Sequence, residues 1–253
     1  MTLPFDEAGA GDPVVLLHAG VADRTMWAEH LQPLADAGHR ALAVDLPGFG
    51  EATPAPVEDA PWLDVLETMD ELGIARATLV GNSFGGAVAQ RVAVLAPERV
   101  LSLALISSPA EGVEPSRELE AVWEAEEAAL GRGDIEAAVQ TVVDAWTLPD
   151  APQELQDRVA AMERRALELQ AQAGEVPEAA DPIAADPAAL ARFDAPALVA
   201  VGEHDKRYFQ LAAEALAGEL PNALLVVLAG AGHLAPLERP REFRELLLSF
   251  LAG

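Results

Sequence analysis

Three residues in widely separated segments have the side chains of a nucleophile, an acid and a base. Ser83 lies in Gly81-Asn82-Ser83-Phe84-Gly85, a G-x-S-x-G motif. Asp205 lies in "VGEHDK" and His233 in "AGAGHLAPLERP". A serine hydroxyl is a weak nucleophile at neutral pH, so it needs a base to remove its proton and a third group to orient that base. His233 and Asp205 are the candidates for these two functions.

The surroundings of Ser83 favour a catalytic serine over a polar residue in a glycine-rich loop. It follows a short apolar run and precedes a helical pattern, as a nucleophile on a sharp strand-to-helix turn must. Small residues at 81 and 85 fit so tight a turn, and a helix N-terminus beneath the serine stabilises negative charge. Taken alone, Asp205 is also a plausible helix N-cap and His233 an ordinary loop histidine. Their joint occurrence in the right loops and order favours catalysis.

Alternating apolar runs and helical patterns predict the scaffold that positions these residues. We expect strands at residues 14–17, 40–50 (ending in a Pro/Gly turn), 77–81, 100–107, 196–202 and 223–230, and helices at 24–37, 62–72, 84–96, 208–218 and 240–251. Strand–helix alternation predicts an α/β fold with a mostly parallel sheet and helices on both faces. Ligands bind at the carboxyl ends of such strands, where the loops holding Ser83, Asp205 and His233 meet.

The alternation breaks at residues 110–192, which show no convincing strand and three amphipathic helical patterns. One of these begins at a plausible N-cap, Asp134. We therefore predict a core domain formed by residues 1–109 and 193–253, with a helical lid inserted at 110–192 after the strand at 100–107. Such a lid would cover the carboxyl end of the sheet.

The charge is strongly negative. The 253 residues include 42 acidic and 16 basic ones, for a net charge of −26, and 110–192 alone carry −13. A surface of this kind repels nucleic acid and anionic lipid, so neither is expected as a partner. Solvated helix faces are the simplest interpretation of the excess acid, with an acidic docking surface as the alternative. We expect a monomer or a homodimer.

Composition limits the chemistry and the location. The chain has no cysteine, which excludes disulfides, thiolate catalysis and cysteine zinc sites. No apolar run approaches the roughly 20 residues that cross a bilayer. The first residues show neither a basic nor an apolar signal region, so a cytoplasmic location is expected. No constellation of metal ligands is visible, and neither a metal nor a cofactor is expected.

Several motifs together resemble the α/β-hydrolase fold superfamily, in its small, lidded, ester- and lactone-hydrolase branch. "VVLLHAG" with a following "MW" is similar to the oxyanion-loop segment, "DLPGFGEA" to the D-x-P-G-x-G loop and "GNSFGG" to the nucleophile elbow. "GEHD" resembles the acid loop and "GAGH" the histidine loop. Two positions depart from the pattern: Ala19 stands where glycine is usual, and Glu51 where serine is common.

The resemblance implies roles for individual residues. Ser83, Asp205 and His233 would be the nucleophile, the orienting acid and the general base. The oxyanion hole would be formed by the backbone N–H of Phe84 and a second backbone N–H from the 18–21 loop. Gly20 is the first choice for this second donor and Val21 the second choice. His18 is expected to bond to backbone and shape this loop rather than to catalyse. The residues expected to contact substrate are Val21, Met26, Trp123, Trp146 and Leu234, although apolar residues at helical spacing are often simply core.

The expected function is hydrolysis of a carboxylic ester or lactone of a small molecule through an acyl-enzyme intermediate. One alternative is C–C bond hydrolysis of ring-cleavage products, since "GNSFGG" also resembles the elbow of that family. The loop after His18 lacks that family's Ser-Gly-Pro-Gly run, and Arg117, Arg158, Arg164 and Arg165 are expected on exposed helix faces. Perhydrolase activity is a common side reaction of such a triad. The remaining alternative is a non-catalytic ligand receptor on the same fold.

Overall fold

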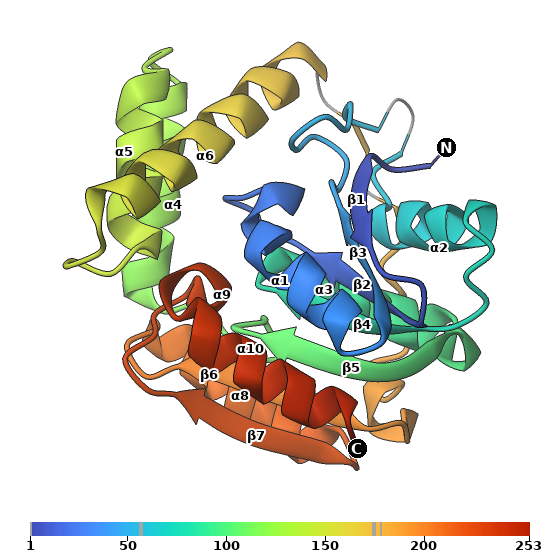
Figure 1. Ribbon diagram of the computed structural model, residues 1–253. Coiled ribbons are helices and arrows are strands. Elements are labelled where there is room, and N and C mark those ends of the chain that lie inside the picture. Colours follow the sequence, from blue (N-terminus) through green and yellow to red (C-terminus); the bar gives the residue numbers. More distant parts are fainter. Residues whose placement is uncertain (1, 56–57, 174–175, 178) are drawn as a thin grey trace.

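A mixed sheet forms the centre of the described chain, which covers residues 2–55, 58–173, 176–177 and 179–253 of a computed structural model. Within these residues seven strands are arranged in the order β1-β3-β2-β4-β5-β6-β7 (Figure 1). Their bounds are β1 (Phe5–Ala8), β2 (Asp12–Leu17), β3 (His39–Val44), β4 (Ala77–Asn82), β5 (Val100–Ile106), β6 (Ala197–Gly202) and β7 (Ala223–Leu228). All neighbouring strands pair in parallel except β1, which runs antiparallel to β3.

The strands lie where the apolar runs predict them. In β2, the run Val14–Leu17 is fully buried because helices cover both faces of the sheet. The expected mostly parallel α/β sheet is confirmed. The edge strand β1 was not predicted, since its sequence, FDEA, carries two acids and has an exposed middle.

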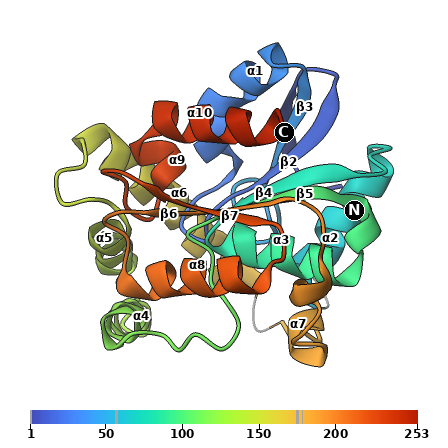
Figure 2. The same cartoon turned by 90° about the horizontal axis from the view of Figure 1, so that it is seen from below.

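Helices cover both faces of this sheet, as predicted. Figure 2 shows α1 (Ala28–Asp36) and α10 (Pro240–Leu251) on one face. On the other face lie α2 (Pro61–Glu71), α3 (Phe84–Leu95) and α8 (Arg207–Glu219). None of the helices within the described residues is both long and apolar enough to cross a membrane.

The chain between β5 and β6 forms further helices that stand together beyond one end of the sheet (Figure 1). These are α4 (Arg117–Leu130), α5 (Ile135–Trp146) and α6 (Gln153–Ala173). The short α7 (Pro182–Ala185) follows them in sequence but lies apart from them, against α3 (Figure 2). Asp134 caps α5 by accepting the Ala137 N–H at 3.1 Å, which confirms the predicted N-cap. Ser116 caps α4 in the same way through the Leu119 N–H at 3.2 Å. The division into a core and a lid at residues 110 and 192 stays a prediction.

Candidate active site

Ser83 lies on a strained turn between β4 and α3. Its φ of 52° and ψ of −113° fall in a region that residues with a Cβ rarely adopt. A Cβ on Gly81 would come within 2.3 Å of the Gly85 carbonyl oxygen, and one on Gly85 within 2.3 Å of the Leu17 oxygen. The Ser83 N–H donates to the Ile106 oxygen at 2.8 Å and ties the turn to β5. The two glycines therefore make possible the turn that projects the serine.

His233 and Asp205 form a buried hydrogen-bonded pair. Nδ1 of His233 lies 3.1 Å from Oδ1 and 3.2 Å from Oδ2 of Asp205, and the side chains are 5% and 0% exposed. A carboxylate accepts hydrogen bonds, so the imidazole proton belongs on Nδ1 and Nε2 is left as the acceptor. The Lys206 backbone N–H donates to Oδ1 of Asp205 at 2.8 Å and holds the carboxylate in place. The arrangement suits a histidine that accepts a proton at Nε2.

Two further buried residues, Asn82 and Glu238, hold the histidine loop. Nδ2 of Asn82 donates to the backbone oxygens of Ile106 (3.1 Å) and His233 (3.2 Å), which links the end of β4 to this loop. Oε2 of Glu238 accepts the Gly232 N–H at 2.6 Å. Burial raises the pKa of Glu238, with the Gly232 N–H acting in the opposite direction. Neither residue was singled out from the sequence.

His18 organises the loop after β2 through its backbone contacts, as expected. Its Nε2 accepts the Leu46 N–H at 2.9 Å, so Nδ1 carries the proton and donates to the Ala19 oxygen at 2.8 Å. Burial lowers the pKa of His18 and favours this neutral form. The Gly85 N–H donates to the His18 oxygen at 3.0 Å and fastens this loop to the start of α3.

Glu51, one of the two departures from the family pattern, takes part in a charged cluster that joins the loops after β2 and β3. Nη2 of Arg24 contacts Oε2 of Glu51 at 2.9 Å, and Nη1 of Arg24 pairs with the fully buried Asp45. The Glu51 N–H donates to Oδ2 of Asp45 at 2.8 Å, and the Arg24 N–H donates to Oδ1 at 2.8 Å. A salt-bridged glutamate therefore stands where serine is common.

A cavity of about 470 Å³ brings Ser83 and His233 together at the carboxyl end of the sheet. It is lined by Ala19, Gly20, Val21, Phe49, Ser83, Phe84, Ala87, Pro109, Trp123, Glu126, Trp146, Glu163, Tyr208, Phe209 and His233. The Trp146 and Phe209 rings pack on His233 with centroids 4.4 and 4.2 Å from the imidazole. We call this space the serine cavity.

Most of the residues expected at the site line the serine cavity, but three do not: Asp205, which lies behind His233, Met26 and Leu234. Gly20, Val21, Phe84, Trp123 and Trp146 belong to the lining, together with Ser83 and His233. Met26 and Leu234 lie outside it and are fully buried. The Met26 sulfur instead accepts the Ala19 N–H at 3.4 Å beneath the loop. The structure thus assigns these two side chains to the core, which was the alternative for apolar residues in such patterns.

Two acidic residues in the lining, Glu126 of α4 and Glu163 of α6, were not singled out from the sequence. Glu163 is only 4% exposed. Burial, followed by repulsion from Glu126, raises the pKa of Glu163 to about 8, and burial also raises the pKa of Glu126. A signal was present, because Glu126 lies four residues after Val122 and Glu163 four after Val159. Each acid therefore interrupts the apolar face of its helix.

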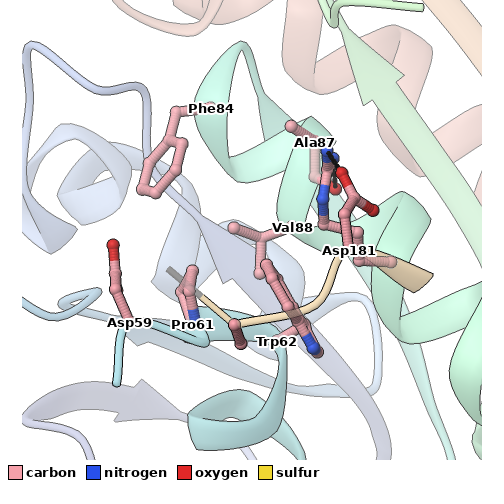
Figure 3. Close-up of a pocket in the computed structure, with 9 residues that line it drawn as sticks. Asp59, Pro61, Trp62, Phe84, Ala87, Val88 and Asp181 are labelled. Atoms are coloured by element: carbon pink, nitrogen blue, oxygen red, sulfur yellow. Dashed lines mark hydrogen bonds and ion pairs between the residues drawn. The ribbon is translucent and has the colours of Figure 1, made fainter. Parts of the chain in front are cut away.

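A second cavity of about 220 Å³ lies next to the serine cavity and shares Phe84 and Ala87 with it. Figure 3 shows these two residues at one end and Asp59, Pro61 and Trp62 at the other. Arg91, which also lines this cavity, forms an ion pair with Asp181 and lies 5.8 Å from the centre of the Trp62 ring. Its cation is thus neutralised within the wall.

Metal ligation is not supported in the described part of the chain, where no group of three or more His, Asp or Glu side chains could hold an ion. The residues that line the serine cavity themselves offer hydroxyl, imidazole and carboxyl groups.

A family model described as the alpha/beta hydrolase family matches residues 14–246. The chain belongs to this family. The match runs from β2 to α10 and so includes the elbow, the acid loop and the histidine loop. The α/β-hydrolase family is thus established for this chain, and esterases and C–C hydrolases are among the proteins similar to it.

Individual relatives of this α/β hydrolase differ in the reaction named for them. This chain is 38% identical over 109 residues to the 2-hydroxy-6-oxo-6-phenylhexa-2,4-dienoate hydrolase of Comamonas testosteroni. The alignment covers 40% of this chain and 38% of that enzyme. The matched part of the chain spans less than half the length of this enzyme and of similar curated relatives.

Among solved structures, a thermophilic esterase from Thermogutta terrifontis matches with a TM-score of 0.79 and 27% identity, covering 99% of this chain and 93% of that one. The enol-lactonase from Burkholderia xenovorans matches with a TM-score of 0.80 and 25% identity, covering 99% and 96%. These similarities extend over the whole chain and include esterases as well as a lactonase.

Proposed function

We propose that this α/β hydrolase cleaves a carboxylic ester or lactone of a small molecule through an acyl-enzyme intermediate on Ser83. The observation that carries the proposal is the buried hydrogen bond from His233 to Asp205, on the wall of the cavity that also contains Ser83. The similarity to an esterase and an enol-lactonase over nearly the whole chain supports the same reaction class.

The chemistry follows from these side chains. Oγ of Ser83 attacks the ester carbonyl carbon while Nε2 of His233 takes the hydroxyl proton, and Asp205 stabilises the imidazolium that forms. The carbonyl oxygen becomes an oxyanion, which the backbone N–H groups of Phe84 and Gly20 are proposed to stabilise. The C–O bond to the alcohol then breaks, and His233 gives its proton to the leaving alkoxide. A water molecule then attacks the acyl carbon while His233 takes one of its protons. The bond between this carbon and Oγ of Ser83 breaks, His233 returns the proton to Oγ, and the acid is released.

Residues 110–192 are proposed to act as a lid on this site. The supporting observation is that α4, α5 and α6 contribute Trp123, Trp146 and Glu163 to the serine cavity. A lid excludes water and shapes the substrate pocket. Substituting Trp123 with alanine should therefore change KM and substrate preference more than it changes the rate of labelling by a small fluorophosphonate.

The direct test combines covalent labelling with turnover of p-nitrophenyl esters and lactones. We expect a fluorophosphonate to label Ser83, and Ser83→Ala to lower kcat by about 10⁴-fold or more while leaving the fold intact. His233→Ala should cost about as much, and Asp205→Asn no more, since the acid orients and does not transfer the proton. Retention of esterase activity by pure Ser83→Ala would refute the proposal.

The alternative of C–C bond hydrolysis is favoured by the similarity to the dienoate hydrolase of Comamonas testosteroni. Against it, the described lining of the serine cavity includes two acidic side chains and no lysine or arginine that could bind an anionic dienoate. A higher specificity constant for a ring-fission dienone than for every ester tested would decide for the alternative. Binding of esters without release of product would instead indicate a receptor.

A further inference from the structure

The acidic residues Glu126 and Glu163 give one side of the serine cavity an unusual composition. They come from different helices, α4 and α6, and both line the space that contains Ser83 and His233. Glu163 is more than nine-tenths buried, and Glu126 is partly buried. A buried carboxyl group in a cavity is normally paired with a cation or held by hydrogen-bond donors.

Glu163 has neither kind of partner within the described residues. No hydrogen bond or ion pair reaches its carboxyl group, although its side chain faces the cavity. The neighbouring arginines of α6 are engaged elsewhere: Arg164 with Glu136 at 2.6 Å, and Arg165 with the Gly50 oxygen at 3.2 Å. A counter-charge for the ionised form of Glu163 would therefore have to come from outside this set of residues.

The single lysine of the chain does not supply that charge either. Nζ of Lys206 lies 3.1 Å from Oε1 of Glu118 and 5.4 Å from the centre of the Trp146 ring, and Lys206 is not part of the cavity lining. The other titratable groups that face the cavity are the phenol of Tyr208 and the imidazole of His233, whose Nδ1 is bound to Asp205.

Aromatic rings share this cavity with the two acids. Trp123 and Trp146 come from the same group of helices, and Tyr208 and Phe209 from α8. The faces of such rings attract ammonium groups, and carboxylates beside them add a direct charge attraction. Cavities that combine the two features are suited to amines that carry a positive charge.

We propose that Glu126, Glu163, Trp123 and Trp146 form an amine subsite, which binds a cationic amine group carried by the substrate. The inference rests on the proposed function and names its substrate class: esters or lactones in which the acyl or the alcohol half bears a protonated amine. The amine supplies the counter-charge that the buried carboxyl group lacks.

Binding of a cation is coupled to the protonation of Glu163. Burial and Glu126 raise the pKa of Glu163 to about 8, so near pH 7 the empty cavity holds this group mainly in its neutral form. A bound ammonium group favours the ionised form, and binding therefore releases a proton. Calorimetry at pH 7 in two buffers with different ionisation enthalpies measures that release.

The first test compares esters of equal shape and different charge. 2-(Dimethylamino)ethyl acetate is protonated at pH 6.5 and has 3-methylbutyl acetate as its neutral isostere. Methyl 3-(dimethylamino)propanoate and methyl 4-methylpentanoate form the corresponding pair for the acyl half. We expect kcat/KM to favour the cation by about tenfold in at least one pair, as one desolvated cation–aromatic or ionic contact allows.

Variants of the two acids make this comparison specific. Glu163→Gln and Glu126→Gln should each lower the cation-to-neutral ratio by about fivefold or more. The matched control is Glu127→Gln, which removes the same charge from an exposed position of α4 next to Glu126 and should leave the ratio unchanged. Preference for the neutral ester in both pairs, or the same ratio in wild type and Glu163→Gln, overturns the proposal.

A binding measurement separates this inference from the proposed function. With Ser83→Ala, calorimetry and tryptophan fluorescence should detect 2-(dimethylamino)ethanol, with affinity about tenfold above that for 3-methyl-1-butanol. Adding Glu163→Gln or Glu126→Gln should remove the difference. Amine binding without ester turnover would refute the esterase proposal and leave the amine subsite standing. Ester turnover with no amine preference and no amine binding would refute the amine subsite and leave the esterase proposal standing.

Discussion

Replacing Glu163 with glutamine should stabilise the fold, and much more so at pH 8 than at pH 5. Its side chain is buried, and within the described residues no donor or cation reaches its carboxyl group. Burial, followed by repulsion from Glu126, raises the pKa of Glu163 from 4.5 to about 8. Glutamine has nearly the same shape and carries no charge.

The magnitude follows from proton linkage. Between pH 4.5 and 8 the folded chain keeps the proton on Glu163 and the unfolded chain loses it, so the free energy of unfolding falls as the pH rises through this window. At about 1.4 kcal/mol per pKa unit, the destabilisation is about 1 kcal/mol at pH 5 and about 4 kcal/mol at pH 8. The advantage of the glutamine variant should therefore grow by about 3 kcal/mol, as an upper limit, between the two pH values.

Thermal and urea unfolding of wild type, Glu163→Gln and the exposed control Glu127→Gln at both pH values measure this difference. For a chain of this size about 1 kcal/mol corresponds to about 2–4 °C in Tm, so the advantage in Tm should be several degrees larger at pH 8. The control should show no such change. An advantage of Glu163→Gln that is equal at pH 5 and pH 8 would contradict the reasoning, because it would mean that Glu163 titrates alike in the folded and unfolded chains.

Three other predictions concern different parts of the molecule. Asn82→Ala should lower kcat on p-nitrophenyl esters by about tenfold with little change in KM, because the Asn82 side chain links the histidine loop to β5. An unchanged kcat would contradict this positioning role. His30→Gln should lose less stability than wild type as the pH falls from 6.5 to 4. Burial lowers the pKa of His30 to about 4, so in this window the unfolded wild-type chain binds a proton that the folded chain does not. Equal losses of unfolding free energy in urea for the two proteins would contradict this. The net charge of −26 should make Tm rise between low salt and about 0.1 M ionic strength, where the screening length is about 10 Å, and a flat or falling Tm would count against self-repulsion.

The sequence was sufficient for the part of the fold that is built from continuous apolar runs. Strands such as β2 and β6 are covered on both faces, so burial demands apolar residues along their whole length. β1 escapes this logic because an antiparallel edge strand has one free side and tolerates acids. β7 shows that an apolar run does not guarantee burial. Its sequence predicts a fully buried strand, but Leu224 and Val227 are 55% and 59% exposed.

The sequence could nominate site residues where a motif fixes the backbone, and it could not where only packing decides. The glycines beside Ser83 and the loops of Asp205 and His233 are local features of the chain, and the structure brings Ser83 and His233 to one cavity. The orientation of Met26 depends on how its loop packs over β2, which helical spacing does not specify. The sequence shows Glu163 only as an acid on an apolar helix face. That pattern indicates a residue of the site only once this face is known to border a cavity.

The lone lysine gives the molecule a single side-chain amine. Lys206 is held between Glu118 and the Trp146 ring, and that ring also packs on His233. The Lys206 side chain is only 13% exposed and is ion-paired, so amine-reactive dyes, biotin esters and aldehyde resins should react more slowly with it than with the chain's terminal amine. A reporter coupled to Lys206 would sit behind the wall of the serine cavity and sense its occupation through Trp146. Lys206→Arg would keep the charge and direct coupling to the terminus alone.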